Sequence, residues 1–324
     1  MNISLVCPAS LPATQFGGIL FLGVHIANKL SKVGHNVTIY TTDLDFSKEK
    51  MIFNKNLPKI EKINDFQSKR THVLWAIYLF FINPSMYIQM LRDKHDIIHV
   101  IGLRSFQAFI ATLISKKKKI PLIISDQGGL TTHPDIHEAS TLKRILIKMQ
   151  FPIIKYILRQ ADIILAANEY ERDIFLKLCD SSKIRIVRNG IDLDELKTSN
   201  IDFKRKYSIK NNFILFLGRF HKVKGVDVLL HSIHEIKNNP LLQNIDFVIL
   251  GSDFGYEKQM LQLIDELKIN NKVHVIKNLP RNDVIAAYNE CEFLVLPSRW
   301  ELSPLTPLEG FTFKKAVIST TAHG

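Results

Sequence analysis

Short apolar runs alternate with longer segments of helical periodicity along almost the whole chain. The first unit joins an apolar run at residues 3–7 to a helical pattern at 19–34 and a second run at 37–41. Strands connected by such crossover helices form parallel sheets that are covered on both faces. The alternation occurs in two halves, separated by a polar, charged segment at 193–210 that we interpret as a linker. We therefore predict an α/β protein with two doubly wound, Rossmann-like domains, residues 1–192 and 211–324, facing each other across a cleft.

The most informative single stretch is residues 293–320, which has the pattern of a strand, a loop, a helix and a second strand. The loop carries Glu301, and the helix carries Glu309 eight positions later. The helix is expected to begin near Ser303-Pro304 or Thr306-Pro307, because hydroxyl residues cap helices and proline suits the first turn. Ligands of open parallel sheets bind at the carboxyl ends of strands, and helix N-termini attract anions. This stretch therefore predicts an anion-binding site next to Glu301.

Two further loops follow predicted strands and have the composition of phosphate-binding loops. Gly17-Gly18 precede the helix at 19–34, where glycines let backbone N–H groups approach a phosphate. Arg219 and Lys224-Gly225 lie between a strand at 213–217 and a helix at 226–237, and both cations can bind phosphate oxygens. Neither loop matches a GxGxxG or Walker pattern, which disfavours a nicotinamide dehydrogenase or a P-loop nucleotidase. Taken alone, an ordinary turn and ordinary helix-start charges explain the same residues.

Several segments, in this order along the chain, resemble the motifs of one enzyme family. They are Gly17-Gly18, Asn189-Gly190-Ile191-Asp192, Gly218-Arg219 with Lys224-Gly225, and Pro297-Ser298-Arg299-Trp300-Glu301 with Glu309. Together they resemble the retaining glycosyltransferases of family GT4, the glycosyltransferase group 1 domain, over nearly the whole chain. The resemblance implies the GT-B fold and transfer of a sugar from a UDP- or GDP-linked donor to an acceptor hydroxyl, with retention of anomeric configuration. It also implies a role in glycolipid, polysaccharide or glycoconjugate synthesis, without a metal or other cofactor.

The resemblance further implies roles for individual residues. Arg219 and Lys224 are expected to clamp the donor diphosphate and, with Glu301, to form the catalytic set. Gln127 and His133 are expected on the acceptor or sugar side. The predicted donor-binding residues are Gly17, Gly18, Gly251, Lys277, Ser303, Leu305 and Glu309, the last for the nucleotide ribose. The acceptor hydroxyl is expected to lose its proton to the leaving phosphate, so the two glutamates are not the acid and nucleophile of a glycosidase.

Three features depart from the family pattern. Leu302-Ser303-Pro304 stands where many relatives have Gly-Phe-Gly, and Pro304 has no backbone N–H, so that contact is expected to move to Ser303 or Leu305. Gln127 stands where many relatives have a histidine, and its amide can bind a sugar hydroxyl but cannot titrate. The chain ends at Gly324, directly after a predicted strand, whereas the family continues with further helices. We therefore expect a fragment or a short form with an incomplete C-terminal domain.

Asp43-Leu44-Asp45 has the spacing of a metal-binding Asp-x-Asp motif. That motif holds a divalent cation in a different glycosyltransferase architecture. Here it follows the second strand of a strand–helix–strand unit, so we interpret it as a solvated loop and expect no metal site.

The net charge of +12 predicts an acidic partner, that is, an anionic lipid, a phosphorylated substrate or nucleic acid. The basic amphipathic segment at 116–159 fits a membrane surface and a core helix with a solvated basic face equally well. A lipid-linked acceptor would explain it. We do not expect nucleic acid, because the basic residues are not interleaved with aromatic residues in a recognisable motif.

Three scattered cysteines and the lack of a secretory signal predict a reducing, cytoplasmic location, with attachment to the inner face of the cell membrane if the basic segment binds lipid. The longest apolar run, residues 73–82, is too short to span a bilayer. The alternative to an enzyme is a non-catalytic sugar-nucleotide-binding or membrane-surface protein. Turnover of the donor would separate the two.

Overall fold

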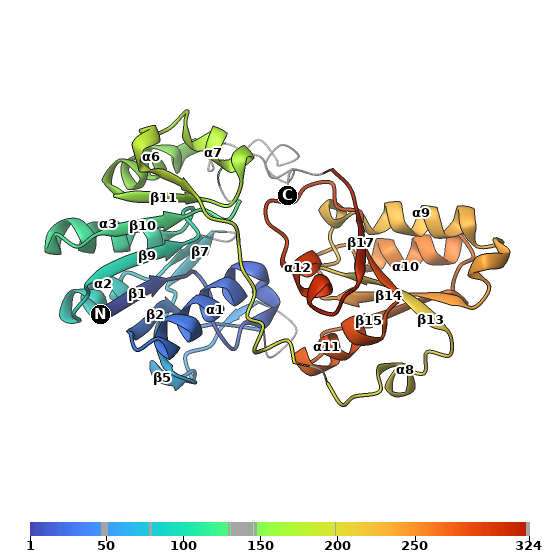
Figure 1. The fold of residues 1–324 in the computed structure, drawn as a ribbon. Helices are drawn as coiled ribbons and strands as arrows, with labels where there is room; N and C mark the ends of the chain where they lie inside the picture. The colour runs from blue at the N-terminus through green and yellow to red at the C-terminus, as the bar shows by residue number, and fades with distance from the viewer. Residues whose placement is uncertain are drawn as a thin grey trace. The chain divides into compact units, whose positions relative to one another are not determined.

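The structure, a computed structural model, describes residues 1–46, 51–77, 80–128, 130, 145, 148–197 and 199–321. The chain divides into two compact units, Met1–Asn189 and Gly190–Gly324. Each unit has its own parallel sheet and its own hydrophobic clusters, which confirms the predicted α/β class with two Rossmann-like sheets (Figure 1).

The first unit is built on an eight-stranded sheet in the order β12-β11-β10-β9-β1-β2-β6-β5, counted over the described residues. Its strands are β1 (Asn2–Val6), β2 (Asn36–Thr42), β5 (Ile60–Ile63), β6 (Phe66–Thr71), β9 (Ile97–Ile101), β10 (Leu122–Ser125), β11 (Ile163–Ala166) and β12 (Ile184–Ile186). All neighbouring pairs are parallel except β5 and β6, which are antiparallel. Two short antiparallel pairs lie outside this sheet, β3 (Leu44–Asp45) with β4 (Ile52–Phe53) and β7 (Trp75–Ile77) with β8 (Phe80–Ile82).

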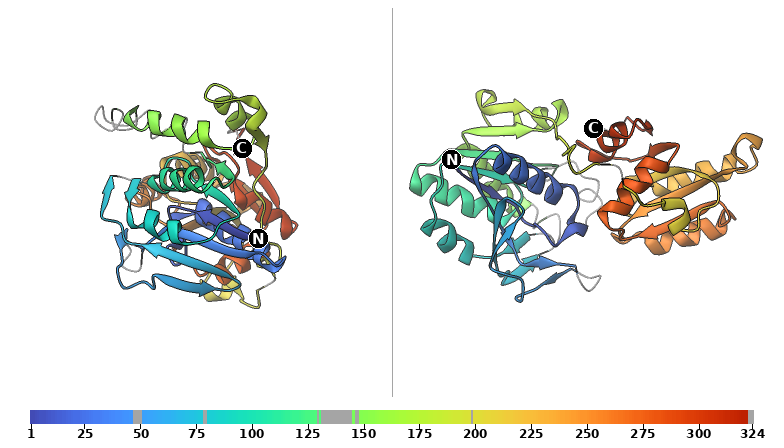
Figure 2. Two further views of the ribbon diagram at one scale, coloured as in Figure 1. Left: turned by 90° about the vertical axis from the view of Figure 1, so that its left-hand side faces the viewer. Right: turned by 60° about the horizontal axis from the view of Figure 1, so that its bottom comes forward.

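Both faces of this sheet are covered, as its alternating side chains require. Leu5 and Ile39 belong to one hydrophobic cluster, whereas their neighbours Val6 and Tyr40 belong to another. The first cluster includes residues of α1 (Gly18–Lys32), and the second includes residues of α2 (Ser85–Arg92), α3 (Phe106–Lys118), α6 (Phe151–Gln160) and α7 (Glu169–Phe175). Figure 2 shows these helices flanking the sheet of the first unit. Two single-turn helices, η1 (Thr14–Phe16) and η2 (Ser181–Lys183), lie in its loops.

The second unit is built on a parallel sheet in the order β15-β14-β13-β16-β17, again over the described residues. Its strands are β13 (Asn212–Leu217), β14 (Ile245–Gly251), β15 (Val273–Lys277), β16 (Phe293–Leu296) and β17 (Ala316–Ser319). Its helices are α8 (Phe203–Lys206), α9 (Val226–Ile236), α10 (Glu257–Glu266), α11 (Arg281–Glu290) and α12 (Leu305–Thr312), with η3 (Lys222–Lys224) and η4 (Pro240–Leu242). Leu215 points into the cluster with α8 and α11, and Phe216 into the cluster with α9 and α10.

The segment at 193–210, which the sequence analysis interpreted as a linker, is part of a folded unit. It lies within the second unit and contains α8. Phe203 in this helix is fully buried, and its ring packs against Phe213 of β13 at a centroid distance of 5.6 Å. Glu290 accepts hydrogen bonds from the backbone N–H groups of Phe203 and Lys204, which fastens α8 to the end of α11.

The interpretation of Asp43 and Asp45 as residues of a solvated loop is wrong. Each is only 4% exposed, and Asp45 belongs to β3. Asp43 accepts a hydrogen bond from the backbone N–H of Val73 and pairs with His72. Asp45 accepts from Asn54 Nδ2 at 2.8 Å. Burial is tolerated because each carboxylate has hydrogen-bond partners. No cluster of residues able to hold a metal ion occurs in the described part of the chain.

The basic segment at 116–159 is partly a core element. Its C-terminal part is α6, which buries Ile154, Ile157 and Leu158 in the core of the first unit, as a core helix would. Ile145, Met149 and Ile153 are nevertheless exposed. The middle of the basic segment, residues 131–144, lies outside the described residues. No described helix combines the length and the apolar composition needed to cross a membrane.

Candidate functional site

The loop between β13 and α9 in the second unit requires a glycine where it meets the end of β16. Gly225 has a φ of +67°, and a Cβ added to it would lie 1.9 Å from the carbonyl oxygen of Pro297. The backbone of Arg299 extends this contact, because its N–H donates to Val223 O at 2.8 Å. The loops at 218–225 and 297–304, which the sequence analysis selected separately, are therefore in direct contact.

Lys224 and Glu301 form the centre of this contact. Lys224 Nζ donates to Glu301 Oε1 at 2.5 Å, and the hydroxyl of Ser298 donates to the same oxygen at 2.7 Å. Glu301 is 8% exposed, and the Lys224 side chain 18%. Two predicted catalytic residues, 77 positions apart, thus come together at the carboxyl ends of adjacent strands.

Arg219 is exposed and lies on the same loop. Its guanidinium lies over the ring of Phe254, 5.0 Å from the centroid. A cation over an aromatic face is attracted by the negative charge density of the ring, so this contact helps to hold the Arg219 side chain. The structure therefore places Arg219 at the same sheet edge as Lys224.

Arg299 is a residue of this site to which the sequence analysis gave no role. Its guanidinium makes a two-pronged ion pair with Asp227 in the first turn of α9, at 2.7 and 2.6 Å, and also donates to Lys222 O at 2.8 Å. These bonds fasten the loop of Glu301 to the start of α9. The sequence analysis included Arg299 only as part of the motif Pro-Ser-Arg-Trp-Glu, and no local pattern pointed to Asp227, 72 positions away.

Glu309 lies on α12, which packs closely on β16 because Gly310 has no side chain: a Cβ there would lie 2.8 Å from Leu294 Cδ1. The Glu309 carboxylate, 6% exposed, accepts from Arg281 at 2.6 and 3.3 Å and from the Tyr288 hydroxyl at 2.7 Å. Burial, together with the adjacent Glu309 carboxylate, raises the pKa of Tyr288 well above its usual value.

Arg281 also connects Glu309 to a distant segment. Its Nε lies 3.5 Å from Glu195 Oε1. The sequence analysis missed Arg281 and Tyr288, because residues of α11 that meet α12 carry no signature of their own. Since a carboxylate offers about four acceptor positions and three are in use, Glu309 retains little capacity for a ribose hydroxyl unless Arg281 moves.

The other predicted donor-binding residues of the second unit lie at the same sheet edge. Gly251 ends β14, and a Cβ there would lie 1.9 Å from Gly218 O, so close strand packing also explains this glycine. Lys277 ends β15 and pairs with Glu257 of α10 at 2.7 Å. Leu305 is the first residue of α12, directly after Ser303-Pro304, and no side chain caps that helix. The helix therefore begins one residue after the earlier of the two predicted starts, Ser303-Pro304, and the predicted hydroxyl cap is wrong.

In the first unit, Gly17 and Gly18 lie at the N-terminus of α1, where the sequence analysis placed them. Gly17 has a φ of +92°, no side chain caps the helix, and its first turn contains no acidic residue. Among the described residues, nothing lies within 4 Å of the position of a Cβ on Gly18. Backbone N–H groups at this end of the helix can therefore be approached by an anion.

Gln127 follows β10 in the left-handed region, with a φ of +59°. Its amide and that of Asn189 exchange two hydrogen bonds, at 3.0 and 2.7 Å. Gln127 thus lies at the predicted sheet edge but is paired within the first unit. His133, the other residue predicted on the acceptor or sugar side, lies outside the described residues.

Comparison with known proteins places this site in a family. The model described as Glycosyltransferase Family 4 matches residues 16–195, and the model described as Glycosyl transferases group 1 matches residues 198–324. A glycosyltransferase of Methanocaldococcus jannaschii, itself uncharacterized, is 25% identical over 333 residues, covering 100% of this chain and 81% of the relative.

Two further relatives align over less of their length. The Escherichia coli UDP-Gal:alpha-D-GlcNAc-diphosphoundecaprenol alpha-1,3-galactosyltransferase is 25% identical over 69% of this chain and 57% of the relative. The D-inositol 3-phosphate glycosyltransferase of Corynebacterium jeikeium is 27% identical over 52% of this chain and 43% of the relative. The chain thus spans about half the length of these two relatives.

Solved structures share the fold. Anabaena HepE in complex with UDP has a TM-score of 0.71 at 15% identity, over 100% of this chain and 82% of that protein. WaaG, a glycosyltransferase involved in lipopolysaccharide biosynthesis, has a TM-score of 0.72 at 17% identity, over 99% of this chain and 82% of that protein. Because one family model matches more than half of the chain and a second matches most of the remainder, the chain belongs to glycosyltransferase family 4 and is a glycosyltransferase of the GT-B fold.

Proposed function

We propose that this protein moves a sugar from a nucleotide-diphosphate sugar to an acceptor hydroxyl with retention of anomeric configuration, in the synthesis of a glycolipid, polysaccharide or other glycoconjugate. The observation that carries the proposal is the contact of Lys224, Glu301 and Ser298 at the carboxyl ends of β13 and β16. Arg219 and the start of α12 lie at the same edge and add positive charge.

The chemistry of the donor explains why cations gather there. Cleavage of the anomeric C–O bond leaves the bonding electron pair on the diphosphate and an oxocarbenium-like sugar. Groups that stabilise the developing negative charge lower the barrier. Lys224 has three N–H donors, of which Glu301 takes one, so the ammonium is oriented and retains donors for the phosphate. Arg219 supplies a second cation, and Ser303 and Leu305 lie where phosphate or sugar hydroxyls would meet the start of α12.

Glu309 would bind the ribose hydroxyls of the nucleotide, and Gly251 and Lys277 would lie along the nucleotide. Since Arg281 and Tyr288 occupy three acceptor positions of Glu309, the ribose must use the remaining position or displace Arg281. Gly17 and Gly18 would offer the N-terminus of α1 to the diphosphate. The acceptor hydroxyl would pass its proton to the leaving phosphate, with no metal, so a chelator such as EDTA should leave turnover unchanged.

Uridine is the nucleotide we favour over guanosine. HepE, which shares the fold, has been solved with UDP and with UDP-glucose, and the Escherichia coli relative is named for UDP-Gal. We therefore propose a UDP-sugar as donor.

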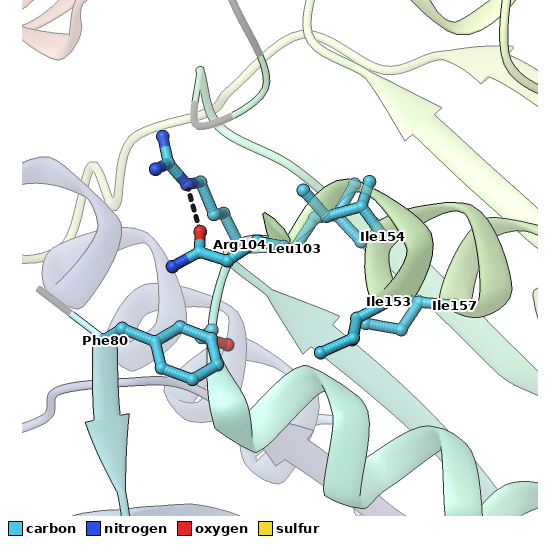
Figure 3. Close-up of a pocket in the computed structure, with 8 residues that line it drawn as sticks. Phe80, Leu103, Arg104, Ile153, Ile154 and Ile157 are labelled. Carbon is cyan, nitrogen blue, oxygen red and sulfur yellow. Dashed lines mark hydrogen bonds between the residues drawn. The ribbon is translucent and has the colours of Figure 1, made fainter. Parts of the chain in front are cut away.

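For the acceptor we propose a phosphorylated compound attached to a lipid. The net charge of +12 favours an anionic partner. A small pocket in the first unit combines apolar residues of α6 and β8 with one cation, Arg104, whose Nε donates to Gln150 Oε1 at 2.8 Å (Figure 3). Ile153 lines this pocket, and Met149 and Ile145 precede it in the sequence at intervals of four residues; all three are exposed, as are Lys148 and Lys155. This combination suits a lipid chain that bears a phosphate.

The role of these exposed residues can be tested separately from catalysis. Cosedimentation with vesicles of phosphatidylcholine and phosphatidylglycerol should retain the wild type, and Met149→Asp should reduce the retained fraction several-fold. A charge-neutral control is Met149→Leu, which should bind like the wild type. Equal retention of the Asp and Leu variants would contradict the membrane-surface role.

The donor site is tested by thermal shift with UDP, GDP, ADP and their sugar conjugates. A ligand at about a hundred times its dissociation constant should stabilise the wild type by about 2.7 kcal/mol. We expect this with UDP, and we expect the Arg219→Ala/Lys224→Ala variant to lose both the shift and sugar transfer. Arg205→Ala, which removes a cation from α8, is a matched control and should keep both. Transfer unchanged in the double variant would refute the diphosphate clamp.

Turnover separates the enzyme from a protein that only binds sugar nucleotides. Release of UDP from UDP-glucose, with water as the acceptor, requires no knowledge of the natural acceptor. Binding of UDP-glucose without release of UDP, also in the presence of membranes that supply acceptors, would favour the non-catalytic alternative. Anomeric configuration in the product, read by NMR coupling constants, tests retention.

A further inference from the structure

The segment Asp43-Leu44-Asp45, to which the proposed function gives no role, directly follows β2, and its first residue lies beside a histidine. β2 and β6 run parallel with Thr42 opposite Thr71, so the residues that follow, Asp43 and His72, leave the sheet side by side. Asp43 Oδ2 and His72 Nδ1 lie 2.5 Å apart, and the backbone N–H of Val73 donates to Asp43 Oδ1 at 3.1 Å. The carboxylate is thus held by two donors at the carboxyl edge of the sheet.

The two side chains differ in exposure. The Asp43 side chain is 6% exposed, whereas that of His72 is 33% exposed. An ionised carboxylate can only accept hydrogen bonds, so Nδ1 carries the proton in this pair. A neutral imidazole carries one proton, so a ring that is protonated at Nδ1 has a lone pair on Nε2. Nε2 of His72 can therefore accept a hydrogen bond. Asp43 therefore fixes both the tautomer and the orientation of the His72 ring.

Buried polar contacts keep this pair in place. Asn83 Nδ2 donates to Thr71 Oγ1 at 2.7 Å, directly before His72, and Gln107 Nε2 donates to Asn83 Oδ1 at 2.6 Å. These side chains are buried. A binding group held in this way loses little conformational freedom when it meets a ligand.

The same edge carries the predicted ligand-binding loops of the first unit. Thr42 Oγ1 donates to Pro8 O at 2.8 Å, and Arg70 Nη2 donates to Leu11 O at 2.7 Å. These bonds fasten the β1–α1 loop, which leads to Gly17-Gly18, onto the ends of β2 and β6. His72 therefore lies at the carboxyl edge of the sheet, the edge at which open parallel sheets bind ligands, and follows β6, two strands away from β1.

We propose that His72, oriented by Asp43, binds a hydroxyl group of the acceptor, and that this acceptor is a sugar or another polyol. The inference rests on the proposed glycosyl transfer and names the chemical class of its acceptor. The hydroxyl donates to Nε2, while Asp43 takes the Nδ1 proton and keeps the ring from rotating. A simple lipid alcohol, which has no further hydroxyl, would gain nothing from this group.

Imidazole NMR tests the assignment without turnover. Each of the 12 histidines gives a Cε1–Hε1 signal, and the one that disappears in His72→Ala belongs to His72. The probes are D-inositol 3-phosphate and N-acetylglucosamine, added to protein saturated with UDP. We expect at least one probe to shift the His72 signal and to bind about five- to tenfold more weakly to His72→Ala, the loss of one hydrogen bond. Asp43→Asn should weaken the probe less, since the ring remains.

The affinity for UDP should change less than about twofold in both variants, since the side chains proposed to bind UDP lie in the second unit and the first unit is proposed to offer only backbone N–H groups at Gly17-Gly18. His231→Ala, which removes an exposed histidine of α9, is the matched control and should bind probe and UDP like the wild type. A His72 signal that neither probe moves, or a probe affinity unchanged in His72→Ala, overturns this inference alone. Failure of the wild type to bind UDP refutes the proposed function instead.

Discussion

Replacing Gly225 by alanine should damage the second unit more than any ordinary glycine substitution. The new Cβ would lie 1.9 Å from the oxygen of Pro297, whereas Cβ atoms essentially never come within 3.0 Å of such an atom, so the two loops must separate by more than 1 Å. The obstacle is backbone, which cannot rotate away as a flexible side chain can. The left-handed conformation adds about 1–2 kcal/mol for any residue with a Cβ.

The magnitude follows from these two contributions. Overpacking in a well-packed region costs about 1–3 kcal/mol, so Gly225→Ala should lose about 2–5 kcal/mol in total. Gly255 is the matched control in the same unit: its φ is +91°, but no atom of the described part of the chain lies within 4 Å of the position of its Cβ. Gly255→Ala should therefore show the backbone contribution alone, about 1–2 kcal/mol.

Urea unfolding followed by fluorescence measures the difference. The chain has two tryptophans, and Trp75 of the first unit is 62% exposed, so a Trp75→Phe background leaves Trp300 as the reporter of the second unit. The affinity for UDP should also fall in Gly225→Ala, because Lys224 and Ser298 adjoin the displaced backbone, and should be unchanged in Gly255→Ala. Equal losses of stability in the two variants would refute the argument from the contact with Pro297.

Two further predictions concern buried charge. Burial lowers the pKa of His99 from 6.5 to about 4. Between these two pH values the imidazole is protonated in the unfolded chain but neutral in the folded chain. The free energy of unfolding therefore falls as the pH drops from about 6.5 to about 4. At about 1.4 kcal/mol per pKa unit, this loss of stability amounts to about 3 kcal/mol. The variant His99→Gln can keep the hydrogen bond to Ser125, and its urea midpoint should fall less steeply between pH 7 and 4.5 than that of the wild type. Parallel curves for the two proteins would contradict the assignment to His99. Arg281→Met leaves the Glu309 carboxylate buried without its cation and should lower the free energy of unfolding by about 3 kcal/mol. The double variant Arg281→Met/Glu309→Leu should recover most of that loss. A double variant as unstable as the single one would show that the ion pair is not the cause.

Much of the fold was predictable from the sequence, for a local reason. Apolar runs and helical periodicity depend on residues within a few positions of one another, and the strands at 3–7, 37–41 and 213–217 are found within one residue of their predicted positions. The glycines at the start of α1 and the earlier start of α12 are equally local features. The identification of Lys224 and Glu301 as partners of one site needed the family resemblance as well, since they are 77 positions apart.

The remaining contacts were decided by the tertiary structure. Arg281 meets Glu309, Arg299 meets Asp227 and Gln127 meets Asn189 only because sheet order and helix packing bring distant segments together. Asp43 was misread for the same reason: a short polar segment after a strand is usually solvated, but here the parallel register of β2 and β6 sets it beside His72 and buries it. Periodicity records which face of a helix or strand is buried, whereas the partner of a buried polar group depends on three-dimensional neighbours that no local pattern encodes.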